Sequence, residues 1–306
     1  MTIHNGCLRQ PFCRSQAIVN APCRAEGDPR KVYDAFLLPL DYTCKNIDMS
    51  PGITNATLIA VYKEPDDRSE MVSQLLFGES YVRGRTIGLW TAITCHFDET
   101  PGWIKKAAWQ EMPENQHTDN VPVVAQKLLY ARSGIPGDPP VPILPGSELH
   151  HYNPSDGTFT VGTTNYQLNG IISGNPPENT REAIVALAEE FINAPELKGG
   201  RSLFGIDAPG LVQIVYKMAG THLPRTAHQQ VEQGRLIPFI HDARPGDLAF
   251  FENDRGVINH VGILLDLNTI IHTSGCVRKN AIDHLGIRKP GQADYSHKLR
   301  VIKSIL

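Results

Sequence analysis

The chain has 306 residues, of which 41% are hydrophobic and 20% charged, proportions that are ordinary for a globular protein of two or three domains. The formal net charge of -3, with no basic run, excludes the electrostatic footprint of a nucleic-acid-binding protein. No apolar run reaches the length of about 18 residues that a membrane span needs, so none is predicted.

The N-terminal stretch "MTIHNGCLRQPFCRSQ" has neither the apolar core nor the small-residue cleavage site of a signal peptide, and it begins an extension of 50 residues. Two locations stay open: the cytoplasm, or the cell envelope or periplasm if a leader has been removed. Four of the six cysteines lie here, which permits one or two disulfides in an exported chain, although buried free thiols are the favoured alternative. Whether this extension, residues 1–50, packs on the rest is also open. The cysteines are Cys7, Cys13, Cys23, Cys44, Cys95 and Cys276.

Short apolar runs separated by Pro- and Gly-rich turns follow up to about residue 178. Runs such as "ATLIAVYKEP", "LWTAIT" and "TFTVGT" are typical of short strands. So many short strands predict two small β-barrels, over residues 51–112 and 113–178.

The pattern changes to helical periodicity at Asn179. Asn179 and Glu182 form a capping-box-like start, and Gly220 is a stop signal for a second helix. Strand-like runs such as "GDLAFFEN" and "HVGILLD" come afterwards, so residues 179–306 are predicted to form an α+β domain with an antiparallel sheet. The predicted apolar helix faces are Ile184, Leu187, Ala188 and Phe191, then Leu211, Ile214, Val215 and Met218.

The second helix begins with "FGIDAPG", the frame of a thiolate-activating helix start without the thiol. A cysteine at Ala208 would have its pKa lowered by the helix dipole and would need a histidine within hydrogen-bond reach. His260 and His272 have the same parity, so a hairpin that turns through residues 266–268 would place them on one face. The spacing therefore fits a Cys-His-His arrangement with the cysteine absent.

The segment from about residue 180 contains five characteristic motifs, which are "GGRSLFGID", "GLVQIVYK", "PGDLAFF", "NHVGI" and "IIHTSG". With these motifs the segment resembles the NlpC family of bacterial cell-wall cysteine peptidases. Upstream, "VYKEPDDRSEMVSQLLFGE" and "FDETPGWI" resemble the bacterial SH3-type barrels of γ-D-glutamyl-L-diamino-acid endopeptidases. The resemblance implies a papain-like α+β domain at the C-terminus behind two SH3-like barrels. It also implies ligands of the L-Ala-γ-D-Glu-diamino-acid type.

The chain departs from the family pattern at several positions of the expected cleft. Ala208 and Pro209 stand where the family has Cys-Ser, and Thr100 replaces a tyrosine that meets the substrate's free amine in relatives. "ELK" replaces an aromatic stretch before the paired glycines. The resemblance implies three catalytic positions, which are Ala208, His260 and His272, and five substrate-binding candidates, which are Thr100, Glu196, Lys198, Asp207 and Pro209.

Asp207 has two compatible interpretations, an amine-binding carboxylate and a plain helix N-cap, and the cap is favoured. Cys276 lies past a turn rather than at a helix start, so we do not expect it to replace the nucleophile. "ELHHYN" is interpreted as an exposed polar turn, because neighbouring residues on a strand point to opposite faces. We predict no metal and no cofactor.

Three hypotheses follow. The favoured one is an inactive homologue that binds a peptidoglycan-derived peptide or a protein partner, because several changes converge on one cleft. The alternative is an active peptidase whose nucleophile has been replaced by Ala208. A scaffold that uses its barrels for adhesion is the third.

Overall fold

The computed structural model describes residues 50–108, 110–113, 121–172 and 180–306. The predicted N-terminal extension, except its last residue, lies outside this part of the chain, as do its four cysteines and Asn179. The remaining two cysteines, Cys95 and Cys276, are free thiols. Within the described residues, no helix is long and apolar enough to cross a membrane.

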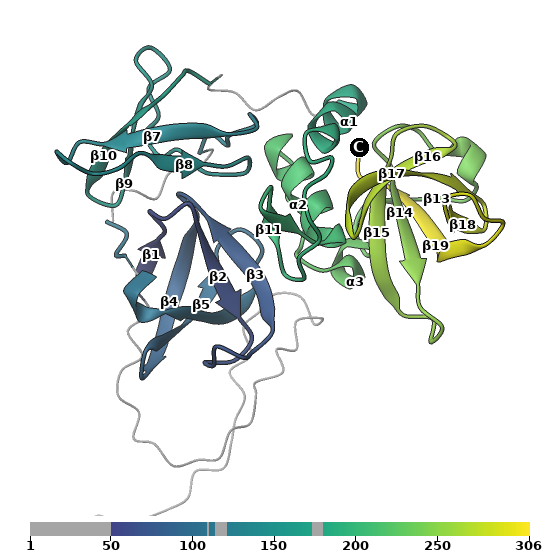
Figure 1. Ribbon diagram of the computed structural model, residues 1–306, viewed down its shortest axis with the longest axis horizontal. Coiled ribbons are helices and arrows are strands. Elements are labelled where there is room, and N and C mark those ends of the chain that lie inside the picture. The colour runs from purple at the N-terminus through teal and green to yellow at the C-terminus, as the bar shows by residue number, and fades with distance from the viewer. Residues whose placement is uncertain (1–49, 109, 114–120, 173–179) are drawn as a thin grey trace, which may run out of the picture. The chain divides into compact units, whose positions relative to one another are not determined.

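The first predicted barrel region contains a six-stranded antiparallel sheet with the order β1-β4-β5-β6-β2-β3 (Figure 1). Alternate residues of β2 are more deeply buried, which is the expected pattern for a strand with one face on a core. That core contains Val61, Leu75, Tyr81, Ile93 and Ile104. The strands are β1 (Pro51–Ile53), β2 (Leu58–Tyr62), β3 (Met71–Leu76), β4 (Ser80–Ile87), β5 (Trp90–Cys95) and β6 (Pro101–Lys105), followed by a 3-10 turn at Lys106–Ala108.

A four-stranded antiparallel sheet, with the order β8-β7-β10-β9, lies within the second predicted region. Its core includes an aromatic group in which Phe77 approaches the rings of Phe159 and Tyr166 edge-on, with centroids 6.0 and 5.3 Å away. Since Phe77 follows β3, the first region contributes a side chain to the second core. The strands are β7 (Leu129–Ser133), β8 (Val141–Ile143), β9 (Thr158–Val161) and β10 (Thr164–Leu168).

The C-terminal part combines three α-helices with a seven-stranded antiparallel sheet of order β13-β19-β14-β15-β16-β17-β18. The end strand β18 also pairs with β19, so this sheet closes on itself (Figure 1). The helices are α1 (Arg181–Glu189), α2 (Ala208–Met218) and α3 (Ala227–Gln230), and a short ribbon joins β11 (Arg201–Ser202) to β12 (Gly205–Ile206). The sheet strands are β13 (Arg235–Ile237), β14 (Leu248–Glu252), β15 (Ile258–Leu264), β16 (Thr269–Ser274), β17 (Cys276–Asp283), β18 (Gly286–Arg288) and β19 (Tyr295–Ser304), with a 3-10 turn at Ile240–Asp242.

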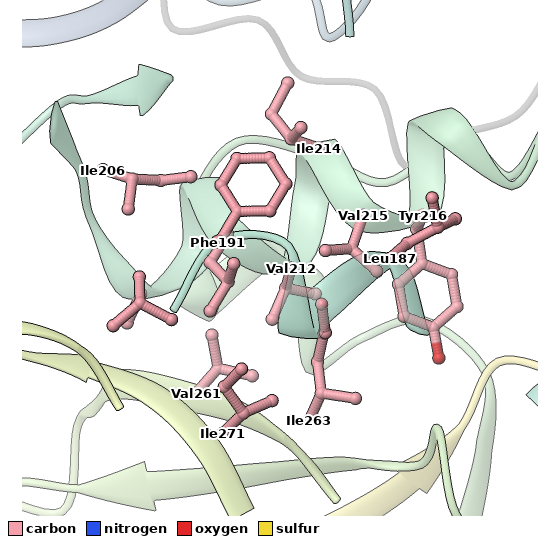
Figure 2. Packing of buried hydrophobic residues seen from close by; sticks show 14 of the residues in the cluster. Leu187, Phe191, Ile206, Val212, Ile214, Val215, Tyr216, Val261, Ile263 and Ile271 are labelled. Carbon is pink, nitrogen blue, oxygen red and sulfur yellow. The ribbon is translucent and has the colours of Figure 1, made fainter. Parts of the chain in front are cut away.

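The apolar faces of α1 and α2 pack on the inner strands of this sheet. Figure 2 shows Leu187 and Phe191 with the α2 residues Val212 and Val215, above Val261, Ile263 and Ile271 of the sheet. Helix α2 ends as predicted, before Gly220, whose positive φ of 80° suits a glycine stop. The N-cap of α1 is Thr180, whose hydroxyl accepts the Ala183 N–H at 3.2 Å; the predicted cap residue, Asn179, lies outside the described residues.

The predicted fold class, an α+β domain behind two strand-rich regions, is therefore confirmed.

Candidate functional site

Asp207 caps the N-terminus of α2, and its carboxylate accepts four hydrogen bonds from three residues. Its Oδ1 accepts the Gly210 N–H at 2.7 Å and its Oδ2 accepts the Gly199 N–H at 2.8 Å. Arg225, which is only 3% exposed, donates to the same two oxygens at 2.9 and 2.8 Å. The predicted cap is confirmed. A ligand amine would have to share or displace these contacts, since both oxygens are already occupied by protein donors.

Ala208 and Pro209 form the first turn of α2, and neither side chain carries a polar group. Ala208 is 5% exposed and belongs to the apolar core, and the Pro209 carbonyl accepts the Gln230 Nε2–H at 2.9 Å. The turn thus has the positive end of a helix dipole with no thiol or hydroxyl for that dipole to activate.

The two described thiols lie elsewhere in the fold. Cys95 is buried in the first barrel, where burial raises the pKa of its thiol far above the usual range, so the thiolate is not formed near neutral pH. Cys276 opens β17 opposite Ser274, in a strand pair rather than at a helix start. Neither has the environment that activates a cysteine nucleophile.

His260 and His272 meet on neighbouring strands, as predicted. The β15–β16 hairpin turns between Leu264 and Thr269, and His260 Nε2 lies 2.9 Å from His272 Nδ1. His272 Nε2 is 3.1 Å from the Asn280 side-chain oxygen, an acceptor, so Nε2 carries the His272 proton. His272 Nδ1 then accepts the His260 N–H, which leaves a lone pair on His260 Nδ1.

A third histidine, His297 of β19, joins this pair. Its ring stacks on that of His260 with centroids 4.0 Å apart and an interplanar angle of 24°. Burial lowers the pKa of His260 well below its usual range and that of His272 to about 4; it also lowers the pKa of His297, an effect that the charge of Glu196 opposes. We call His260, His272 and His297 the histidine cluster; at neutral pH its rings are uncharged.

A cleft of about 560 Å³ lies between the first barrel and the segment before α3. Its walls include Thr100, Asp98 and Glu99 of the barrel and His222 and Arg225 of the C-terminal part. The Thr100 N–H donates to Asp98 Oδ1 at 3.0 Å. Burial lowers the pKa of His222, so its ring is neutral at pH 7. Because Arg225 also binds Asp207, the cleft adjoins the cap of α2.

Glu196 and Lys198, two of the predicted substrate-binding residues, do not line this cleft. Glu196 Oε2 accepts the Gly275 N–H at 2.6 Å and is thereby tied to the turn after β16. The Lys198 side chain is 81% exposed and pairs with Glu70 at 2.6 Å. The predicted residues therefore gather in two places: Thr100 in the cleft, with Asp207 beside it, and Glu196 near the histidine cluster.

A buried charge cluster, which the sequence did not indicate, joins the first barrel to the C-terminal part. Arg201 donates to both oxygens of Glu79 at 2.8 and 2.9 Å, and Lys217 Nζ donates to Glu79 Oε1 at 2.6 Å. All three side chains are at most 4% exposed. We call Glu79, Arg201 and Lys217 the charge cluster.

The "ELHHYN" segment is not the exposed turn that we expected. His150 is 2% exposed and its Nε2 lies 2.8 Å from the Gly78 carbonyl oxygen, whereas His151 faces solvent. Glu148 pairs with Lys217 at 2.7 Å. The opposite orientation of the two histidines is confirmed, but the segment is part of the packing between regions.

Comparison with known proteins agrees with the fold. Residues 197–295 match the NlpC/P60 family and residues 61–108 match the bacterial dipeptidyl-peptidase SH3 domain. A γ-D-glutamyl-L-lysine dipeptidyl-peptidase of Bacillus subtilis is 26% identical over 214 residues, which cover 66% of this chain and 71% of that protein. Dipeptidyl-peptidase 6 of Lysinibacillus sphaericus is 27% identical over 258 residues, which cover 73% and 87%.

Among solved structures, an NlpC/P60 family protein from Bacillus cereus matches with a TM-score of 0.72 and 16% identity, over 84% of this chain and 100% of that one. At this identity the match concerns the fold. It extends over the barrels as well as the C-terminal domain.

Proposed function

We propose that this chain, which carries an NlpC/P60 domain behind bacterial SH3-type barrels, binds peptidoglycan-derived peptides without cleaving them. The observation that carries the proposal is Ala208 in the first turn of α2, where a cysteine peptidase of this fold needs its thiol. The relatives' names imply the ligand class, peptides with a γ-D-glutamyl-diamino-acid link.

Without a thiol, the His260–His272 pair has no proton to remove. A papain-like mechanism needs a thiolate that attacks the carbonyl carbon and a histidine that returns the proton to the leaving amine. Here Ala208 offers no proton that the lone pair on His260 Nδ1 could accept. Water attack on an amide with only a neutral imidazole as base lacks the covalent route that makes these enzymes fast.

The cleft supplies groups that suit such a peptide. Asp98 and Glu99 bring negative charge to one wall, which favours a ligand's free amine. The guanidinium of Arg225, which lies at the opposite side, is neutralised by Asp207. Thr100 adds a half-buried hydroxyl that can donate or accept.

Calorimetry with L-Ala-γ-D-Glu-diamino-acid peptides tests binding, and release of free amines tests cleavage. We expect saturable binding with no turnover. Thr100→Arg, which fills the cleft, should weaken binding at least tenfold, whereas Thr94→Arg, at an exposed threonine of the same barrel, should leave it unchanged. Thiol-sensitive turnover, or equal binding by the two variants, would contradict the proposal.

A second candidate, a peptidase whose nucleophile has been replaced, is favoured by the intact relay from His260 through His272 to Asn280. On this hypothesis Ala208→Cys creates thiol-dependent hydrolysis of the same peptides, and adding His260→Ala reduces it by about 10²- to 10⁴-fold, the contribution of a general base. A folded Ala208→Cys protein that binds the peptide but stays inert would rule this candidate out.

A further inference from the structure

Three strands bring imidazole nitrogens together in the C-terminal sheet. His260 comes from β15, His272 from β16 and His297 from β19, and one ring nitrogen of each lies within 4.8 Å of those of the other two. Sequence positions 260, 272 and 297 do not form a motif. In the sheet, β15 pairs with β16, and only β14 separates β15 from β19.

The surroundings keep these rings in the form that binds metals. Neutral imidazole is the ligand form, and the His260 and His272 side chains lie in a buried environment, only 9% and 1% exposed. His272 already donates its outer N–H to the Asn280 oxygen at 3.1 Å, which is the usual outer contact of a metal-bound histidine and aims its other nitrogen inward. The negative charge of Glu196 acts on His297, so a cation here is partly compensated.

We infer that His260, His272 and His297 form a site for a divalent transition-metal ion of zinc type. Imidazole ligands suit Zn²⁺, Ni²⁺ and Cu²⁺ rather than Mg²⁺ or Ca²⁺. Three histidines and one open position are the ligand count of a zinc site that can still take an exogenous ligand.

The geometry requires limited rearrangement. The His260 and His272 nitrogens are 2.9 Å apart, close to the roughly 3.3 Å that separates two ligands of tetrahedral zinc at about 2.0–2.1 Å each. His260 moves its proton from Nε2 to Nδ1, which is a change of tautomer with no net proton release. The His297 ring, stacked on His260 at 4.0 Å, tilts so that its nitrogen points at the ion.

Zinc titration of the full chain against a chelator of known affinity tests the site, with cobalt(II) absorption as a second readout. His297→Gln should lower the number of tightly bound ions by one and remove the cobalt band of nitrogen ligation. His241→Gln is the matched control, because that side chain is 71% exposed and outside the cluster. Asn280→Ala should weaken the site by about 10- to 100-fold. Zinc held by the chain's cysteines is unchanged in all three variants and cancels in the comparison.

Thermal unfolding separates loss of the site from loss of the fold. Without metal, His297→Gln should melt as a single cooperative transition, and zinc should raise the melting temperature of the unaltered protein but not of this variant. Equal zinc stoichiometry in the unaltered protein and in folded His297→Gln, or no zinc bound by the unaltered protein, would overturn the inference. Peptide binding does not enter either measurement, so the outcome is independent of the proposed function.

Discussion

The charge cluster and the histidine cluster are both buried polar groups, but the protein buries one as ions and the other as neutral rings. Glu79 meets two cations at 2.6 to 2.9 Å, and Arg201 also donates to Gln213 and to the Gln74 carbonyl. The histidines contact one another and two neutral side chains, Asn280 and Ser296. Ions in a dry interior need opposite charges close by, whereas imidazole can give up its charge instead.

This difference separates a structural role from a chemical one. The donors of the charge cluster are directed at Glu79 and Gln74 of the first barrel, at Gln213 of α2 and at Glu148 of the second region, so the cluster has little capacity for a ligand and serves to join regions of the chain. The histidine cluster keeps a lone pair on His260 Nδ1 and a ring, His297, that stacks on His260 and whose Nδ1 lies 2.9 Å from Ser296 Oγ.

Removing the anion of the charge cluster should have the largest effect. Although burial opposes ionisation, Arg201 and Lys217 lower the pKa of Glu79 to about 2. Glu79→Gln would leave two buried cations under-compensated, and we expect a loss of about 3 to 5 kcal/mol in the free energy of unfolding, measured with urea.

Glu70→Gln is the matched control for this experiment. Glu70 is also a barrel carboxylate paired with a lysine of the C-terminal part, but its partner Lys198 is 81% exposed. Its removal should cost less than about 1 kcal/mol. Similar losses for Glu70→Gln and Glu79→Gln would show that burial does not distinguish the two pairs.

Acid should destabilise the histidine cluster while the charge cluster is still ionised. The pKa of His272 is about 4 in the fold against 6.5 when exposed, so the unfolded chain binds more protons between these values. Stability is therefore complete above about pH 6.5 and decreases as the pH falls toward 4, by about 3 kcal/mol for His272 alone.

Urea unfolding at pH 7 and pH 5 measures this effect, with His272→Gln as the control that removes the titrating ring. His272 alone should contribute a drop of about 2 kcal/mol between the two pH values, so the unaltered protein should lose more stability than the variant. Since Glu79 has a pKa of about 2, it stays ionised in the fold over this range. Equal pH dependence of both proteins would contradict the neutral-ring description.

The sequence predicts the histidine pair better than the charge cluster for a physical reason. His260 and His272 lie on one hairpin, so strand parity alone places them on one face. Glu79 and Arg201 are 122 residues apart and belong to different regions, and no periodicity links them. His297 is missed because β19 joins the sheet beside β14, away from the hairpin along the chain.

Asp207 combines two roles: its carboxylate is the N-cap of α2 and also the ion partner of Arg225. Asp207→Asn keeps a good cap but removes the charge that faces Arg225, so we expect a loss of about 2 kcal/mol. Asp207→Ala should lose about 1 kcal/mol more, because the Gly210 N–H then has no capping acceptor. If Asp207→Asn unfolds at the same urea concentration as the unaltered protein, the Arg225 pair contributes nothing. The carboxylate would then be available to a ligand amine, and the cleft would extend to the start of α2.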